Sequence, residues 1–188
     1  MDWDPVYKSN YENTAFSPWP WINSARCLLA SAKVLEPKVL ELWENMKNQP
    51  FKRLPVNYTG PYFMLIAFAV ENYFKAAIVK KKYLDFKKEF RENKKQKFPK
   101  DLNSHKLINL AKKAGFILSK GEEGLLRRLT RHAIWAGRYP IPTDYSKSTI
   151  SELFSDGTEH AVSYYGGDDV ERLNILLKDI EERLEFWK

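Results

Sequence analysis

Arginines and a histidine cluster in the last third of the chain, in the run Arg127-Arg-Leu-Thr-Arg-His132. Arginine binds phosphate oxygens through charge-assisted hydrogen bonds, and histidine transfers protons near neutral pH. Two cations one helical turn away should lower the pKa of His132, because like charge disfavours protonation, and a general base must be neutral. We therefore take His132 as a candidate general base, with Arg127 as a cation on the same predicted helix. The candidate phosphate-binding residues are Arg128, Arg131 and Arg138.

A helix that ends before Gly137 is predicted to position this run. It begins with a capping box, Ser119-Lys-Gly-Glu122. On a helical wheel the leucines form the core face, with His132 at its border and Arg127 about 140° from His132. The plainer alternative to catalysis is a border histidine bonded to a carbonyl group, with the arginines paired to acids of the last helix.

A second pair of charged residues, Glu71 and Lys75, lies inside the most apolar segment, Tyr62–Val79. The segment is about long enough to span a bilayer, but charges near the centre of a membrane helix are costly. We therefore predict the buried central helix of a soluble bundle, with no membrane contact. The simplest interpretation of the i, i+4 pair is an intrahelical ion pair. The alternative is that Glu71 points into a groove of the bundle and orients His132 or one of the arginines.

The remaining segments also favour helices. Residues 22–46 have helical composition with a break or kink at Pro37, and residues 104–114 form a short helix that Gly115 ends. The last helix begins near Asp168, whereas residues 139–167 are mostly loop. Residues 1–21 contain three prolines among aromatic side chains and are predicted to be an irregular arm. No stretch alternates as strands do, so the predicted fold class is all-α, a bundle of about five helices over residues 22–188.

Length, cysteine content and charge narrow the class of protein. A chain of 188 residues suits one domain, and the single cysteine, Cys27, excludes an intrachain disulfide framework. The acidic start has no signal-peptide pattern, so we expect a cytoplasmic protein. No glycine-rich phosphate loop or metal-spaced cluster occurs, and neither a cofactor nor a metal is expected. The net charge of +7 is local, because Lys75–Lys100 holds 11 Lys or Arg against 3 Asp or Glu. Such a segment is either a polyanion-binding surface or a solvated helix end.

Four motifs, in their order along the chain, resemble the HEPN domain (higher eukaryotes and prokaryotes nucleotide-binding). They are Glu71-Asn-Tyr-Phe-Lys75-Ala, His105-Lys-Leu-Ile-Asn-Leu before Gly115, Arg127-x4-His132, and Arg138-Tyr139-Pro140. The resemblance covers about residues 22–188 and implies a homodimer that cleaves RNA without a metal, as a toxin or defence component. It also implies one composite site between two signature helices, where His132 moves protons and Arg127 holds the phosphate. The helical wheel offers a physical reason for a shared site. Arg127 and His132 are too far apart around one helix, but two helices that meet at a two-fold axis can bring them together.

Two features leave a second interpretation open. Active members of that family often have a small polar residue directly after the signature arginine, where this chain has Arg128. Some relatives with the Arg-Tyr-Pro ending lack nuclease activity and act as partners of small nucleotidyltransferases. The alternative to an RNA-binding protein or endoribonuclease is therefore a non-catalytic helical module that binds a partner protein or a nucleotide.

Overall fold

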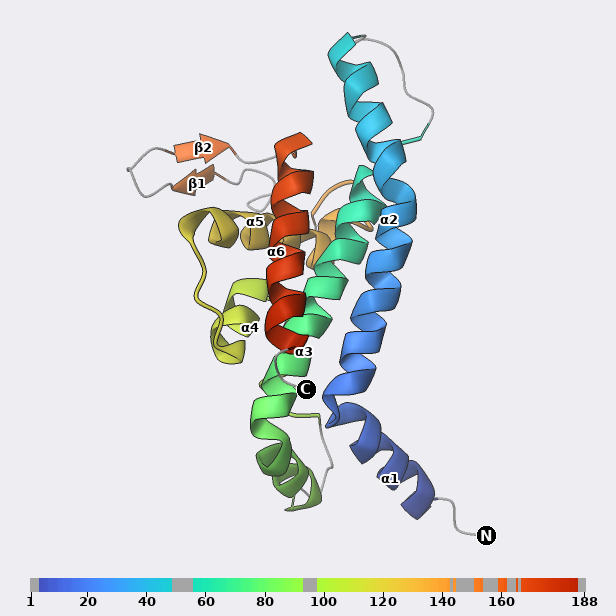
Figure 1. The fold of residues 1–188 in the computed structure, drawn as a ribbon, viewed down its shortest axis with the longest axis vertical. Coiled ribbons are helices and arrows are strands. Elements are labelled where there is room, and N and C mark those ends of the chain that lie inside the picture. The colour runs from blue at the N-terminus through green and yellow to red at the C-terminus, as the bar shows by residue number, and fades with distance from the viewer. Residues whose placement is uncertain are drawn as a thin grey trace.

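The computed structural model describes residues 4–48, 56–92, 98–142, 144, 151–153, 159–161, 165 and 167–185. The helices are α1 (Asp4–Ala15), α2 (Pro18–Asn48), α3 (Thr59–Glu92), α4 (Leu107–Ala114), α5 (Lys120–Arg131), the π-helical turn η1 (His132–Ala136) and α6 (Gly167–Glu185). Two three-residue strands, β1 (Ser151–Leu153) and β2 (Glu159–Ala161), pair antiparallel in a region predicted to be loop. The all-α class is confirmed, with this small hairpin as its one addition in the described part of the chain (Figure 1).

Helix α3 is the centre of the bundle. It runs beside α2, while α4, α5, η1 and α6 pack against its other sides (Figure 1). The predicted apolar positions are all buried, and they are Phe63, Ala67, Val70, Phe74 and Ala77. By length and hydropathy α3 is the one described helix that could cross a membrane, but 78% of its most apolar 18-residue window is buried inside the bundle. Burial on nearly every side explains why the helix is apolar all round.

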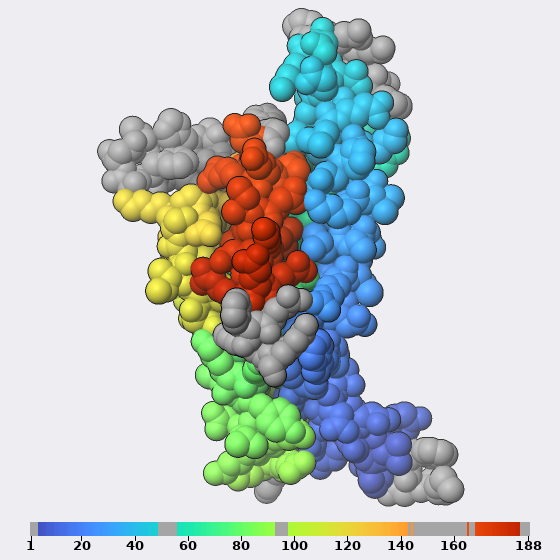
Figure 2. Space-filling model, viewed as in Figure 1, coloured from blue at the N-terminus to red at the C-terminus, as the bar shows by residue number. Residues whose placement is uncertain are grey.

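Residues 4–21 differ from the prediction of an irregular arm, because all but two of them form α1 and the start of α2, whereas residues 1–3 lie outside the described residues. The prolines lie in first turns, where a missing N–H leaves no hydrogen bond unmade, so they begin these helices instead of breaking them. Helix α1 is held by distant contacts: the Tyr11 ring stacks on Phe90 at 5.2 Å, and Arg91 donates two hydrogen bonds to Glu12. It projects from one end of the molecule (Figure 2).

Two further boundaries depart from the sequence prediction. Helix α2 is not broken at Pro37 and continues to Asn48, with Val39 and Leu42 buried beyond the proline. Helix α3 extends past the apolar segment to Glu92, and a local kink at Lys82 (φ −114°, ψ 19°) separates its apolar and lysine-rich parts. Tertiary packing therefore overrides both the helix-breaking residue and the change in composition.

The short elements follow their predicted signals closely. Helix α4 ends at Gly115, whose φ of +85° lies in the left-handed region that glycine adopts without strain. The capping box of α5 is present in both directions, because the Ser119 hydroxyl accepts from the Glu122 N–H and the Glu122 carboxylate accepts from the Ser119 N–H. The helix that carries the arginine–histidine run is thus fixed at its start by local chemistry.

Candidate functional site

The arginine–histidine run lies on α5 and continues into η1. Leu125, Leu126 and Leu129 are buried as predicted, so α5 presents its expected face to the core. At His132 the α-helix gives way to a five-residue π-helical turn, a local feature that is frequent at functional sites. The turn is held close to α3, because a Cβ added at Gly137 would lie 2.4 Å from the Cβ of Met64.

His132 is enclosed by aromatic rings at the amino-terminal end of α3. Its ring centre lies 5.5 Å from that of Phe63 and 5.3 Å from that of Tyr165. Burial lowers its pKa to about 4, the charge of Arg131 acts in the same direction, and a backbone interaction with Gly60 opposes the shift. Its buried Nδ1 accepts or donates no hydrogen bond within the described residues. The lowered pKa of His132 agrees in direction with the sequence prediction. Burial is its larger cause, however, and the neighbouring cation its smaller one.

Protonation of His132 should destabilise the folded protein. Its pKa is lower in the folded state (about 4) than the ordinary value of 6.5, so the unfolded chain takes up the proton first as pH falls. The free energy of unfolding should therefore fall as the pH drops from 6.5 to 4. Between pH 7.5 and pH 5 the expected loss is about 2 kcal/mol. Denaturant unfolding of the wild type and of His132→Phe over this range measures the difference. Equal pH slopes for the two proteins would contradict the enclosed, neutral histidine.

Arg127 and His132 occupy different environments on the same helix. Arg127 is exposed, and it forms no ion pair or hydrogen bond with any residue that the structure describes. His132 lies mostly inside, as their separation on the wheel predicts. Within one chain, therefore, the two candidate catalytic residues are not brought into a single pocket.

Arg128 is not placed to bind a phosphate, which corrects the sequence prediction. Its guanidinium donates to both carboxylate oxygens of Asp169 on α6, at 2.9 and 2.5 Å, and it lies over the Tyr165 ring at 4.9 Å. The two charged side chains are only 12% and 10% exposed. Two parallel N–H···O bonds occupy the face that a phosphate would need. The alternative of arginines paired to acids of the last helix is therefore confirmed for Arg128.

The other two candidate phosphate-binding arginines lie on either side of η1. Arg131 is half-buried beside His132. Arg138 is exposed, donates to the Ile134 carbonyl oxygen and lies over the Tyr139 ring at 5.6 Å. Arg127 and Arg138 are therefore the cations in this region that are best placed to meet a ligand from solvent.

Glu71 and Lys75 form a buried pair, but Glu71 orients a different histidine from the predicted one. Its Oε1 accepts from Lys75 Nζ at 2.6 Å, and its Oε2 accepts from His105 Nδ1–H at 2.9 Å. The side chain of His105 is 57% exposed, whereas that of Glu71 is 7% exposed. The prediction that Glu71 orients His132 or an arginine is therefore wrong. Because the Nδ1 of His105 is bound to a carboxylate, its Nε2 is the nitrogen left for proton transfer, an arrangement common in acid–base histidines.

His105 is the functional candidate that sequence reasoning did not select. The signal that could have found it is the acid at position 71, which needs partners in so apolar a helix, but 34 residues separate the two. Lys75 has a further contact, since its Nζ lies 5.6 Å from the centre of the Trp21 ring on α2. In the described ranges no three His, Cys, Asp or Glu side chains group closely enough to hold a metal ion.

Comparison with known proteins gives no assignment. No family model matches the chain, and neither a curated protein nor a solved structure matches it.

Proposed function

We propose that this protein binds RNA and cleaves it without a metal ion, as a HEPN-like cytoplasmic homodimer with a toxin or defence role. The observation that carries the proposal is the placement, on successive turns of α5 and η1, of a largely enclosed His132 and of Arg127, which is exposed and has no ion pair among the described residues. A neutral imidazole can accept a proton, and a solvent-facing guanidinium can bind a phosphate.

RNA is the substrate that suits such a pair. The 2′-hydroxyl of ribose is a nucleophile already positioned next to the phosphodiester, so its attack is intramolecular. His132 takes the proton from the 2′-hydroxyl as the 2′-oxygen–phosphorus bond forms. The His132 imidazolium then returns this proton to the leaving 5′-oxygen as the phosphorus–5′-oxygen bond breaks. Arg127 stabilises the negative charge that develops on the phosphate. The products are a 2′,3′-cyclic phosphate and a 5′-hydroxyl.

The separation of the two side chains on α5 favours a site shared by two copies. A dimer axis close to α5 would place Arg127 of each copy near His132 of its partner. The exposed Ile134 of η1 and the exposed Tyr139, which follows η1, supply apolar surface for such a contact. A strict monomer at micromolar concentration would remove the physical reason for pairing these residues.

Cleavage and its residue dependence test the proposal. We expect generic RNA, but not DNA, to be cleaved in the presence of EDTA and to carry 2′,3′-cyclic phosphate ends. Arg127→Ala and His132→Phe should each lower the rate at least a hundredfold, because each removes a group that acts at the reacting phosphate. His132→Phe keeps a ring against Phe63, and Lys178→Ala, an exposed cation of α6, is the matched control that should remain active. No cleavage by the wild-type dimer, or equal activity in all variants, would rule out the nuclease.

One observation favours the second candidate, a non-catalytic module that binds a partner protein such as a small nucleotidyltransferase. Arg128, directly after Arg127, is bonded to Asp169, so its guanidinium is not available to bind a substrate phosphate. If RNA is bound but not cleaved, the binding module is the better description. If no RNA is bound either, a partner protein becomes the occupant to seek.

A further inference from the structure

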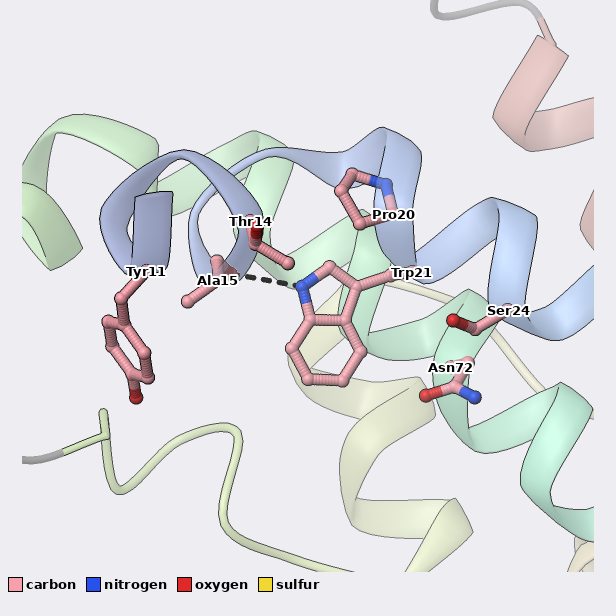
Figure 3. Close-up of a pocket in the computed structure, with 7 residues that line it drawn as sticks. All are labelled: Tyr11, Thr14, Ala15, Pro20, Trp21, Ser24 and Asn72. Carbon is pink, nitrogen blue, oxygen red and sulfur yellow. Dashed lines mark hydrogen bonds between the residues drawn. The ribbon is translucent and has the colours of Figure 1, made fainter. Parts of the chain in front are cut away.

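A pocket opens where α1, α2 and α3 meet. Its volume is about 280 Å³, just below the range of about 300–1,000 Å³ typical of sites for drug-sized ligands. The lining residues are Tyr11, Thr14, Ala15, Pro20, Trp21, Ser24 and Asn72. Trp21 lies between Tyr11 on one side and Ser24 with Asn72 on the other (Figure 3). The size suits one planar ring system.

The aromatic walls of the pocket are held in place from behind. The Trp21 Nε1–H donates to the Ala15 carbonyl oxygen at 3.0 Å (Figure 3). The Trp21 ring also packs on that of Phe98, with 6.0 Å between the ring centres. Tyr11 is fixed by its stack on Phe90. Walls that are already ordered lose little conformational entropy when a ligand binds, so a small ligand can be held.

Asn72 supplies the polar recognition group. It is half-buried at the pocket edge, yet its side-chain amide makes no hydrogen bond to any residue in the described ranges. Such an amide offers one donor and one acceptor side by side, the pattern that pairs with N6–H and N7 of adenine. The Ser24 hydroxyl, on the same side of Trp21, adds a second donor or acceptor.

The charge around the pocket favours a polyanion. Tyr11 rests on the lysine-rich end of α3, and Lys88 there is exposed and without an ion pair among the described residues. Lys75 lies behind Trp21, but its charge is balanced by that of Glu71. Proteins that bind single-stranded nucleic acid combine a basic surface with aromatic side chains on which bases stack.

We propose that the Trp21–Asn72 pocket binds an unpaired adenine base of single-stranded RNA, with Trp21 as the stacking surface and Asn72 reading the base edge. The proposal deepens the RNA-binding function and rests on it. It gives the amino-terminal helix a role, because α1 supplies Tyr11 and Thr14 to the pocket.

Binding of decamers of adenylate and uridylate, at fixed salt, tests base recognition. We expect the adenylate strand to bind about tenfold more tightly, the discrimination typical of one bidentate base contact. Asn72→Ala should lose this preference and leave uridylate binding unchanged. Asn109→Ala, an exposed helical asparagine on α4, is the matched control and should keep it. Equal affinity for both strands in the wild type, or an unchanged preference in Asn72→Ala, would overturn the proposal.

A second measurement separates failure of the pocket from failure of RNA binding. Adenosine monophosphate at millimolar concentration should shift the NMR signal of the Trp21 indole N–H, identified by its loss in Trp21→Phe. A shift without RNA binding would support the pocket and refute the RNA function. RNA binding without a shift would refute the pocket alone. If the protein shows neither the shift nor RNA binding, both proposals are refuted.

Discussion

Glu71→Leu is expected to destabilise the protein by about 3–5 kcal/mol, the largest effect of any single change considered. The substitution replaces the carboxylate with an apolar side chain of similar size, and it leaves the Lys75 ammonium buried without its acceptor. Chemical denaturation at pH 7 measures the loss. The control is Glu71→Leu combined with Lys75→Met, which removes both charges and should recover most of the stability.

This pair of variants separates two roles of Glu71. If the single variant is nearly as stable as the wild type, Lys75 must escape to solvent and the pair is not a buried one. In the double variant the fold is retained while His105 loses its carboxylate. Any change in RNA binding or cleavage by the double variant therefore reports on His105 or on the contact of Lys75 with Trp21, and not on stability.

Asp169→Leu should cost about 3 kcal/mol, because it leaves the guanidinium of Arg128 largely enclosed and without its acceptor. The stack on Tyr165 remains, so part of the arginine's contact survives. Thermal and denaturant unfolding give the measurement. The control is Glu182→Ala, which breaks an exposed pair with Lys178 and should change stability by less than about 0.5 kcal/mol.

The same variant tests the assignment of Arg128. If Arg128 is a structural partner of Asp169, Arg128→Met should destabilise the protein to a similar degree, and the Arg128→Met, Asp169→Leu double variant should recover stability. If instead Arg128 binds phosphate, Asp169→Leu would strengthen RNA binding with little loss of stability. That second pattern would restore the original prediction for Arg128.

Features encoded by neighbouring residues were predictable from the sequence. The capping box at Ser119, the leucine face of α5 and the stop at Gly115 each depend on residues within a few positions of one another. The burial of α3 also followed from its apolar composition. These signals were enough for the all-α class and for the helix that carries the candidate site.

Features that depend on distant pairs were not predictable. Glu71 meets His105 across 34 residues, and Arg128 meets Asp169 across 41. Helix α1 is stabilised by Phe90 and Arg91, far along the chain, so the prolines of residues 1–21 alone suggested an irregular arm. In each case the partner was chosen by the packing of helices, which composition and periodicity do not contain.

The π-helical turn at His132–Ala136 also bears on how this chain should be aligned with others. A π turn closes its hydrogen bonds over one residue more than an α turn does. A related chain with a regular helix here would have one residue fewer between His132 and Gly137. An alignment without that gap would shift the glycine that faces Met64 out of register, although the arginine–histidine spacing before the turn would still match.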